Sequence, residues 1–206
     1  MDTMRKIIAC LFLTMDGVIQ SPGSRDEDRK NNFKWGGWSF PYWDDVMNQS
    51  MAKITAEPYD LLLGRRTYEI FAAFWPHQQN DPTSEMFNKV EKYVVATTTV
   101  DTSWVNTSLI TGNVVQELEK LKASDGPNLL IYGSADLCQT LFEHHLIDVL
   151  HTWTFPVTLG SGQRLFEEGT QPEQWKLADA VVSSTGVIMA NYSPDGDVKT
   201  GSMSGG

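Results

Sequence analysis

Apolar residues along the chain gather in short continuous runs, and between these runs they recur at helical spacing. Continuous runs bounded by turn residues predict buried strands at Lys6–Leu13, Asp60–Leu63, Tyr93–Thr97, Ser108–Ile110, Asn128–Tyr132 and Val149–Phe155. The helical spacing predicts helices at Asp44–Thr55, about Thr67–Phe74, Ser84–Val90, Asn113–Leu121 and Ala135–Leu146. Two alternating segments, Trp175–Ser183 and Gly186–Tyr192, flank the turn letters SSTG and predict a closing hairpin.

This order of elements predicts an α/β fold. Strands that alternate with helices favour a mostly parallel sheet, and the closing hairpin adds an antiparallel edge. One connection, residues 21–41, is long and rich in Gly, Pro and Asp, and a connection of that length is either functional or disordered. The sequence shows no repeat and no linker, so residues 1–195 are expected to form one domain and residues 196–206 a flexible tail.

Composition and charge exclude several classes of protein. The net charge is −10 and the 16 Lys and Arg residues are scattered, which argues against a nucleic-acid partner. The N-terminal apolar run is too short to span a membrane, and no membrane partner is expected. The 2 Cys residues form no CxxC motif, so a disulfide framework is not expected and the cytoplasm is the expected compartment. A metal site is not expected either, because His144 and His145 are adjacent and point in different directions, while His77 and His151 are isolated.

The letters LLLGRRTYE, where a buried strand becomes a helix, form the first candidate site. A helix start leaves unpaired N–H groups and a partial positive charge. Gly64 lets a ligand approach the backbone, Arg65 and Arg66 add two cations, and Thr67 can cap the helix or bind an oxyanion. The junction therefore predicts an anion site, most simply for phosphate. The alternative is a solvated helix start with a capping threonine.

The letters IYGSADL form a second junction of the same kind, at Gly133-Ser134. Two strand–glycine–helix junctions could clamp the two phosphates of a dinucleotide. The spacing is not GxGxxG, so an ordinary Rossmann domain is not expected. The alternative is a tight turn in which Ser134 only caps the following helix.

Two further segments have open interpretations. Asp16-Gly17 lies between apolar runs, which is typical of a hairpin turn, although the strand edge could instead border a flat ring. Residues 154–169, with Pro156 and the glycines of LGSG, could form a mobile loop over a pocket or a plain connection between edge strands.

In four ordered motifs the chain resembles the dihydrofolate-reductase-like superfamily: MDGVI, LLLGRRTYE, VVATTT and IYGSADLCQTLFEHHLIDVLHTWTFPVTLGSGQRLFEEG. Within that superfamily it is most similar to the riboflavin-biosynthesis reductase (RibD C-terminal domain) family, as a stand-alone member. The resemblance covers roughly residues 5–192. It implies a three-layer fold with a mostly parallel central sheet, NADPH as cofactor, hydride transfer to a small molecule, and a homodimer.

The resemblance also implies roles for single residues around NADPH. Residues at the first junction would hold phosphates, with Arg65 as the candidate for the 2′-phosphate: Gly64, Arg65, Arg66 and Thr67. The second junction would cradle the diphosphate and open its helix: Gly133, Ser134, Ala135, Asp136 and Leu137. Two threonines would lie near the adenosine and two apolar residues against the nicotinamide, respectively Thr97, Thr98, Phe12 and Ile19. Many family members carry two or three glycines where this chain has Gly-Ser-Ala, and a preference for NADPH over NADH rests mainly on the two arginines.

On the substrate side the resemblance is to dihydrofolate reductases, which place a carboxylate on the first helix. Asp44 and Asp45 are the candidates here, although acidic residues at a helix start need no other role. Trp38, Phe40 and Trp43 could form an aromatic wall for a flat ring or could equally pack the core.

These candidates lead to three hypotheses for function. The first is an NADPH-dependent reductase of a small flat heterocycle, pyrimidine- or pterin-like, resembling 5-amino-6-(5-phosphoribosylamino)uracil reductase. No HxE or PCxxC deaminase signature accompanies it. The second is a non-catalytic nucleotide- or heterocycle-binding protein of the same fold, and the third is a structural dimer.

Overall fold

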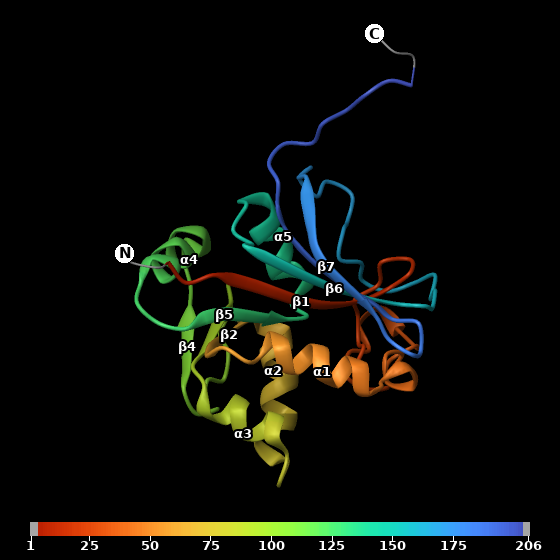
Figure 1. The fold of residues 1–206 in the computed structure, drawn as a ribbon. Helices are drawn as coiled ribbons and strands as arrows, with labels where there is room; N and C mark the ends of the chain where they lie inside the picture. The colour runs from red at the N-terminus through yellow and green to blue at the C-terminus, as the bar shows by residue number, and fades with distance from the viewer. Residues whose placement is uncertain (1–3, 204–206) are drawn as a thin grey trace.

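The computed structural model describes residues 4–203, and its core is one eight-stranded sheet (Figure 1). The strands lie in the order β4-β3-β2-β5-β1-β6-β8-β7. Pairs from β4 to β6 are parallel, and β8 is antiparallel to both β6 and β7. The strands are β1 (Ile7–Thr14), β2 (Tyr59–Gly64), β3 (Lys92–Val95), β4 (Thr107–Ile110), β5 (Asn128–Tyr132), β6 (Val149–Phe155), β7 (Trp175–Val182) and β8 (Ile188–Pro194).

Helices cover both faces of the sheet, which confirms the three-layer α/β fold. Five α-helices are present among residues 4–203: α1 (Asp45–Ile54), α2 (Arg65–Phe74), α3 (Pro82–Lys89), α4 (Val114–Ala123) and α5 (Ala135–Glu143). Three short 3-10 helices accompany them in the same range: Lys30–Asn32, Phe40–Tyr42 and Trp75–His77. Figure 1 shows α4 and α5 on one face and α1, α2 and α3 on the other.

Strand β1 shows that both faces of the sheet are packed with apolar side chains. Successive side chains of a strand point to opposite faces. Ala9 and Leu11 pack in the cluster that holds α4 and α5, whereas Cys10 packs in the cluster that holds α1, α2 and α3. A central strand that is buried on both faces has a continuous apolar sequence, and this apolar run predicts β1.

The long connection of residues 21–41 is folded back on itself rather than extended. Trp38 donates from Nε1 to the Gln20 carbonyl at 2.8 Å, and the backbone N–H of Gly37 donates to the Ser21 carbonyl at 2.9 Å. Gly36 passes so close to residues 24–25 that a Cβ there would lie 2.4 Å from the Arg25 carbonyl oxygen. This packing fixes where residues 21–28 lie against the rest of the fold.

A buried ion pair ties the N-terminal segment to the centre of the sheet. The Arg5 guanidinium bonds the carboxylate of Asp60 and the carbonyl of Pro127, and it lies over the ring of Tyr93 with its carbon 5.2 Å from the ring centroid. The side chains of Arg5 and Asp60 are only 2% and 9% exposed.

After β8, residues 195 and 196 still pair with Gln174 through backbone hydrogen bonds. Residues 195–203 contain no helix or strand, and Figure 1 shows them extending away from the sheet. Across residues 4–203, no helix has the length and apolarity needed to cross a membrane.

Candidate active site

The candidate site lies at the carboxyl ends of β2 and β5, which are parallel neighbours. The chain leaves β2 into α2 on one face of the sheet and leaves β5 into α5 on the other (Figure 1). Such a switch of faces opens a crevice in α/β sheets, and ligands bind there. A pocket of about 670 Å³ lies at this place. It is lined by residues from both junctions, from residues 19–30 and from the sheet face that α1, α2 and α3 cover.

The two helix starts are held together by direct hydrogen bonds. The backbone N–H of Gly64 donates to Ser134 Oγ at 3.0 Å, and the N–H of Ser134 donates to Thr67 Oγ1 at 3.0 Å. Thr67 is therefore the acceptor of a cross-link and not the cap of α2, whose N-cap is the extended residue Gly64. Helix α2 accordingly begins at Arg65, two residues before the predicted start. The first-turn N–H groups of two helices thus face one pocket, which is the arrangement that binds phosphate.

The two arginines of the first junction have different surroundings. Arg65 is 49% exposed and pairs with Glu69 at 3.1 Å, one turn further along α2. Arg66 pairs with Asp28, whose side chain is 8% exposed, so residues of the long connection are drawn to the phosphate-type junction. Among residues 4–203, Arg66 Nε is the buried side-chain nitrogen or oxygen without a hydrogen-bond partner. This N–H group is closed to solvent, and the part of Arg66 that is open to the pocket is the rest of its 42% exposed side chain.

Below the junctions the pocket continues into an apolar chamber. Phe12 stacks on Trp153 with ring centroids 5.1 Å apart and tilts against Trp43 at 5.8 Å. The chamber wall also includes apolar and aromatic residues that the sequence did not single out: Cys10, Met51, Ile70, Phe71, Trp75, Phe87 and Tyr132. Burial raises the pKa of the Tyr132 hydroxyl well above its usual value, so it stays a neutral hydrogen-bonding group. A chamber of this kind suits a flat apolar ring.

Comparison with known proteins decides the family. The family model described as RibD C-terminal domain matches residues 5–189. The chain belongs to the RibD C-terminal domain family. The uncharacterized protein YyaP of Bacillus subtilis (strain 168) is 25% identical over 194 residues, which cover 91% of this chain and 94% of YyaP.

Solved structures establish the fold of this RibD C-terminal domain as dihydrofolate-reductase-like. A protein assigned to riboflavin biosynthesis in Shewanella sp. PV-4 has a TM-score of 0.64 at 21% identity, over 92% of this chain and 99% of that one. Dihydrofolate reductase from Enterococcus faecalis, solved with NADP(H) and RAB-propyl, has a TM-score of 0.59 at 16% identity, over 92% and 96% of the two chains.

The structure of this RibD C-terminal domain brings most of the residues predicted for the cofactor to one pocket. The lining contains thirteen of the residues named from the sequence: Phe12, Ile19, Trp43, Gly64, Arg65, Arg66, Thr67, Thr97, Gly133, Ser134, Ala135, Asp136 and Leu137. Thr98 is exposed and lies outside the lining, because β3 ends at Val95 and the chain turns away after Thr97.

Four residues predicted for the substrate side lie outside the pocket lining. Trp38 is 6% exposed and packs edge-on against Phe155 at 5.2 Å, so it belongs to the core. Phe40 is 77% exposed. Asp44 caps α1, accepting from the Met47 N–H at 2.9 Å, and it also accepts from the N–H and Oγ of Ser184. Asp45, the first residue of α1, is exposed.

The carboxyl of Asp44 is also electronically unsuited to donate a proton. The hydrogen bond from the Ser184 hydroxyl, with that from the Met47 N–H, lowers its pKa below the usual value. A carboxyl with a lowered pKa holds its charge and gives up no proton near neutral pH. The structure thus favours the alternative interpretation of this residue as a helix cap.

The Asp16-Gly17 turn closes on its own flank, where the Thr14 N–H donates to the Val18 carbonyl at 3.0 Å, and it also pairs with the later loop. The Ile19 N–H donates to the Gln163 carbonyl at 2.9 Å, and the Gly160 N–H donates to Asp16 Oδ2 at 2.8 Å. The hydrogen bond from the Thr14 hydroxyl lowers the pKa of Asp16, so it keeps the charge that holds these N–H groups. Residues 154–169 are therefore fastened beside the pocket, and Gln163 reaches its lining.

The sequence missed two acidic residues of the pocket, Glu27 and Asp28. They lie in the irregular connection, where no periodicity marks which side chains turn inward, and a run such as SRDEDR reads as a solvated surface. Burial raises the pKa of Glu27 above its usual value, in contrast to Asp44. Elsewhere in residues 4–203, no three His, Cys, Asp or Glu side chains are grouped as a metal site requires.

Ser134 has a backbone conformation that favours glycine, so substitutions there test what its hydroxyl contributes. Its φ of 58° and ψ of 47° are left-handed, a conformation that costs a residue with a Cβ roughly 1–2 kcal/mol. Ser134→Ala keeps that strain and loses the bond from Gly64, so we expect a loss of about 1–2 kcal/mol in the free energy of unfolding. Ser134→Gly loses the bond but relieves the strain, and should stay within about 0.5 kcal/mol of the parent. Urea unfolding of both variants checks this, and equal losses would contradict it.

Proposed function

We propose that this protein is a cytoplasmic, NADPH-dependent reductase that transfers hydride to a small flat heterocycle of the pyrimidine or pterin type. The observation that carries the proposal is the pair of helix starts, cross-linked through Ser134 and Thr67, which opens onto an apolar chamber. Membership of the RibD C-terminal domain family and the likeness to a dihydrofolate reductase solved with NADP(H) support it.

The residues of the pocket fit a dinucleotide. Its two phosphates match the first-turn N–H groups of α2 and α5, and Arg66, whose side chain is 42% exposed and lines the pocket, supplies a cation beside them. Gly133, at φ +57°, presents no Cβ to a diphosphate lying along α5. Arg65 is exposed enough to reach a 2′-phosphate. Phe12 and Ile19 would then border the nicotinamide.

In the proposed reaction the bound nicotinamide supplies hydride. The chain's own contribution is to orient and to exclude water. Phe12, held between Trp43 and Trp153, presents a fixed apolar surface. The loop of residues 156–164 is fastened by Asp16, and its Gln163 reaches the lining of the same pocket. The cross-linked junctions fix the phosphate positions, and with them the reach of the ring into the chamber.

A non-catalytic protein that binds the same ligands is the second candidate. The observation that favours it is the position of Asp44 and Asp45, which lie outside the pocket lining and so supply no acid to it. The cytoplasmic setting is supported by the two thiols, since Cys10 and Cys138 are both buried and unpaired. A homodimer remains part of the proposal on the family resemblance.

Titration with NADPH and NADH, followed by tryptophan fluorescence, tests the proposed function. Trp43 and Trp75 line the pocket, so binding should quench their emission. We expect Arg65→Ala to weaken NADPH binding about 10-fold or more, the worth of a charge-assisted hydrogen bond, and NADH binding less than about 3-fold.

The control for this titration is Lys120→Ala. Lys120 is an exposed cation on α4, paired with Glu117, and it lies outside the pocket lining. It should leave both affinities unchanged. If neither nucleotide binds the parent protein at millimolar concentration, the proposed function is wrong. If both bind and no pyrimidine or pterin is reduced, the non-catalytic candidate stands.

A further inference from the structure

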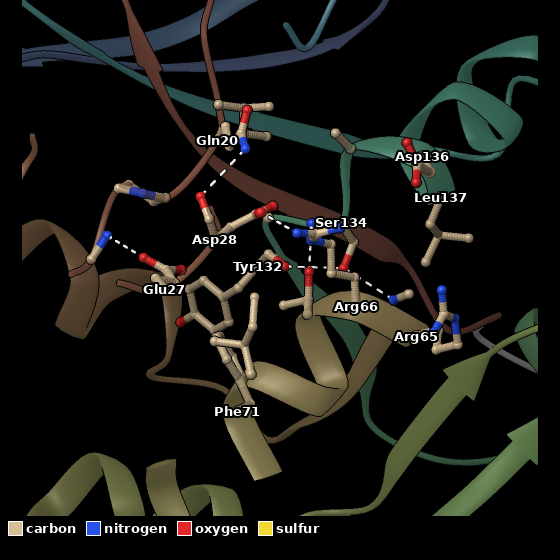
Figure 2. Close-up of a pocket in the computed structure, with 18 of the residues that line it drawn as sticks. Gln20, Glu27, Asp28, Arg65, Arg66, Phe71, Tyr132, Ser134, Asp136 and Leu137 are labelled. Carbon is tan, nitrogen blue, oxygen red and sulfur yellow. Dashed lines mark hydrogen bonds and ion pairs between the residues drawn. The ribbon is translucent and has the colours of Figure 1, made fainter. Parts of the chain in front are cut away.

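Residues 27 and 28 place two neighbouring carboxylates in the same pocket with different partners. Asp28 points to Arg66 at the phosphate-type junction. Glu27 lies at the opposite end, and in the view of Figure 2 its carboxyl is on the far side of Asp28 from Ser134 and Arg65. Because Asp28 has its cation, Glu27 is the acidic group of residues 21–28 that is left for a ligand.

One oxygen of Glu27 is occupied and the other is not. Oε2 accepts from the backbone N–H groups of Gly23 at 2.6 Å and Ser24 at 3.0 Å. These two bonds use the lone pairs of that oxygen. Within residues 4–203, Oε1 accepts no hydrogen bond, although the residue lines the pocket. Oε1 is open to solvent, so a ligand in the pocket can reach it and supply a donor.

The segment that carries Glu27 is rigidly supported. The Asp28 N–H donates to Ser21 Oγ at 3.1 Å, and Gln20 Nε2 donates to the Asp28 carbonyl at 3.4 Å. Arg66 fastens Asp28 to α2, and Gly36 closes the other side of the loop by its contact with residues 24–25. A carboxyl held by a packed shell of this kind can select a ligand by geometry.

The electrostatic surroundings of Glu27 leave it as an acceptor of N–H groups. Burial raises the pKa of Glu27, and the charge of its neighbour Asp28 adds a smaller effect in the same direction. The other charged side chains of the pocket are Lys30, Arg65, Arg66 and Asp136. Two of them, Arg66 and Arg65, already have carboxylate partners.

We propose that Glu27 is the residue that selects the substrate, by accepting through Oε1 a hydrogen bond from an amino group or ring N–H of a flat heterocycle. This inference rests on the proposed function, since it names the substrate chemistry of the same pocket. A ring whose edge carries an N–H donor satisfies Oε1, and a ring of the same size with only acceptors at that edge meets a carboxylate and is repelled.

Glu27→Gln gives the sharpest test, because the backbone fixes how the new amide must lie. The N–H groups of Gly23 and Ser24 require an oxygen at the position of Oε2. The amide nitrogen must then take the place of Oε1, which converts the acceptor into a donor. The variant should therefore keep its loop and reverse its preference.

Two pyrimidines of similar shape serve as probes at pH 8, in the presence of saturating NADPH. One is 2,4-diaminopyrimidine, which offers N–H donors, and the other is 2,4-dimethoxypyrimidine, which offers none. We expect the parent protein to bind the diamino compound about 10-fold or more tightly than the dimethoxy compound. Glu27→Gln should abolish or invert that ratio, and Glu27→Ala should bring it to about 1.

Asp26→Asn is the matched control, since Asp26 is a neighbouring carboxylate that is 66% exposed and paired with Arg29. It should keep the parent ratio. The inference is overturned if the parent protein shows no preference for the diamino compound, or if Glu27→Gln retains it. NADPH titration of every variant separates the two proposals: failure of NADPH to bind the parent protein defeats the proposed function, whereas normal NADPH binding with an unchanged ratio in Glu27→Gln defeats only the role of Glu27.

Discussion

Asp60→Ala is expected to lower the free energy of unfolding by about 3–5 kcal/mol, since it leaves a buried charge without its partner. The Arg5 guanidinium is 2% exposed, and Asp60 is the carboxylate that balances it at the centre of the sheet. The bond from Arg5 to the Pro127 carbonyl and the ring of Tyr93 cannot replace a full negative charge. Denaturation in urea, with the slope compared between variants, measures the loss.

Two further variants test whether the loss of stability arises because the Arg5–Asp60 ion pair is buried. Asp26→Ala breaks the ion pair with Arg29, in which both side chains are about two-thirds exposed, and should cost less than about 0.5 kcal/mol. The double change Arg5→Met, Asp60→Leu removes both buried charges at once and should recover most of the loss. A single Asp60→Ala that unfolds like the parent protein would contradict the expectation.

Arg66→Ala is expected to weaken the binding of NADPH and NADH alike, by about 10- to 100-fold, because a phosphate loses one charge-assisted hydrogen bond. The same change strips Asp28 of its cation while the carboxylate stays buried. The effect on the two nucleotides should be equal, in contrast to Arg65→Ala, because both carry the diphosphate. Fluorescence titration of the two nucleotides measures it.

Asp28→Asn separates the two consequences of losing this ion pair. It releases the Arg66 guanidinium and removes a negative charge from the pocket, so nucleotide binding should stay the same or become tighter. Its effect on the loop should resemble that of Arg66→Ala. Should Asp28→Asn weaken binding as strongly as Arg66→Ala, the arginine would act through the loop and not on the phosphate.

Much of the fold could be predicted because its strands are continuous apolar runs that end at glycine or at turn residues. The bounds of β5 and β6 agree with the prediction, since Gly133 and Pro156 follow them directly. The predicted start of α2, at Thr67, is two residues later than the observed start at Arg65. Thr67 has the chemistry of an N-cap residue, but the N-cap of α2 is Gly64. The threonine hydroxyl instead accepts a hydrogen bond from the N–H of Ser134. This N–H group belongs to a residue 67 positions away, and no local pattern contains it.

The candidate site also has a part that the sequence predicts and a part that it does not. The phosphate-type junctions are local motifs, and the rule that parallel strands share their carboxyl edge brings Gly64 and Ser134 together. The acidic residues of the pocket depend on irregular backbone. Asp44 has the expected type and place in the sequence, yet Ser184, 140 residues later, takes up its carboxylate. Glu27 turns inward only because residues 23–28 form a compact loop whose N–H groups hold it.

The position of β1 has a consequence for how the chain is made. This most apolar strand lies between β5 and β6, and the bond from the Lys6 N–H to Asn128 spans 122 residues. During translation β2, β3 and β4 can pair soon after they emerge, whereas β1 must wait until both of its late neighbours leave the ribosome. Contacts of such separation slow folding and prolong the exposure of unpaired apolar strands. The nascent chain therefore carries IIACLFLT without a partner for most of its synthesis, and the ligand pocket comes into being only when β5 is inserted beside it.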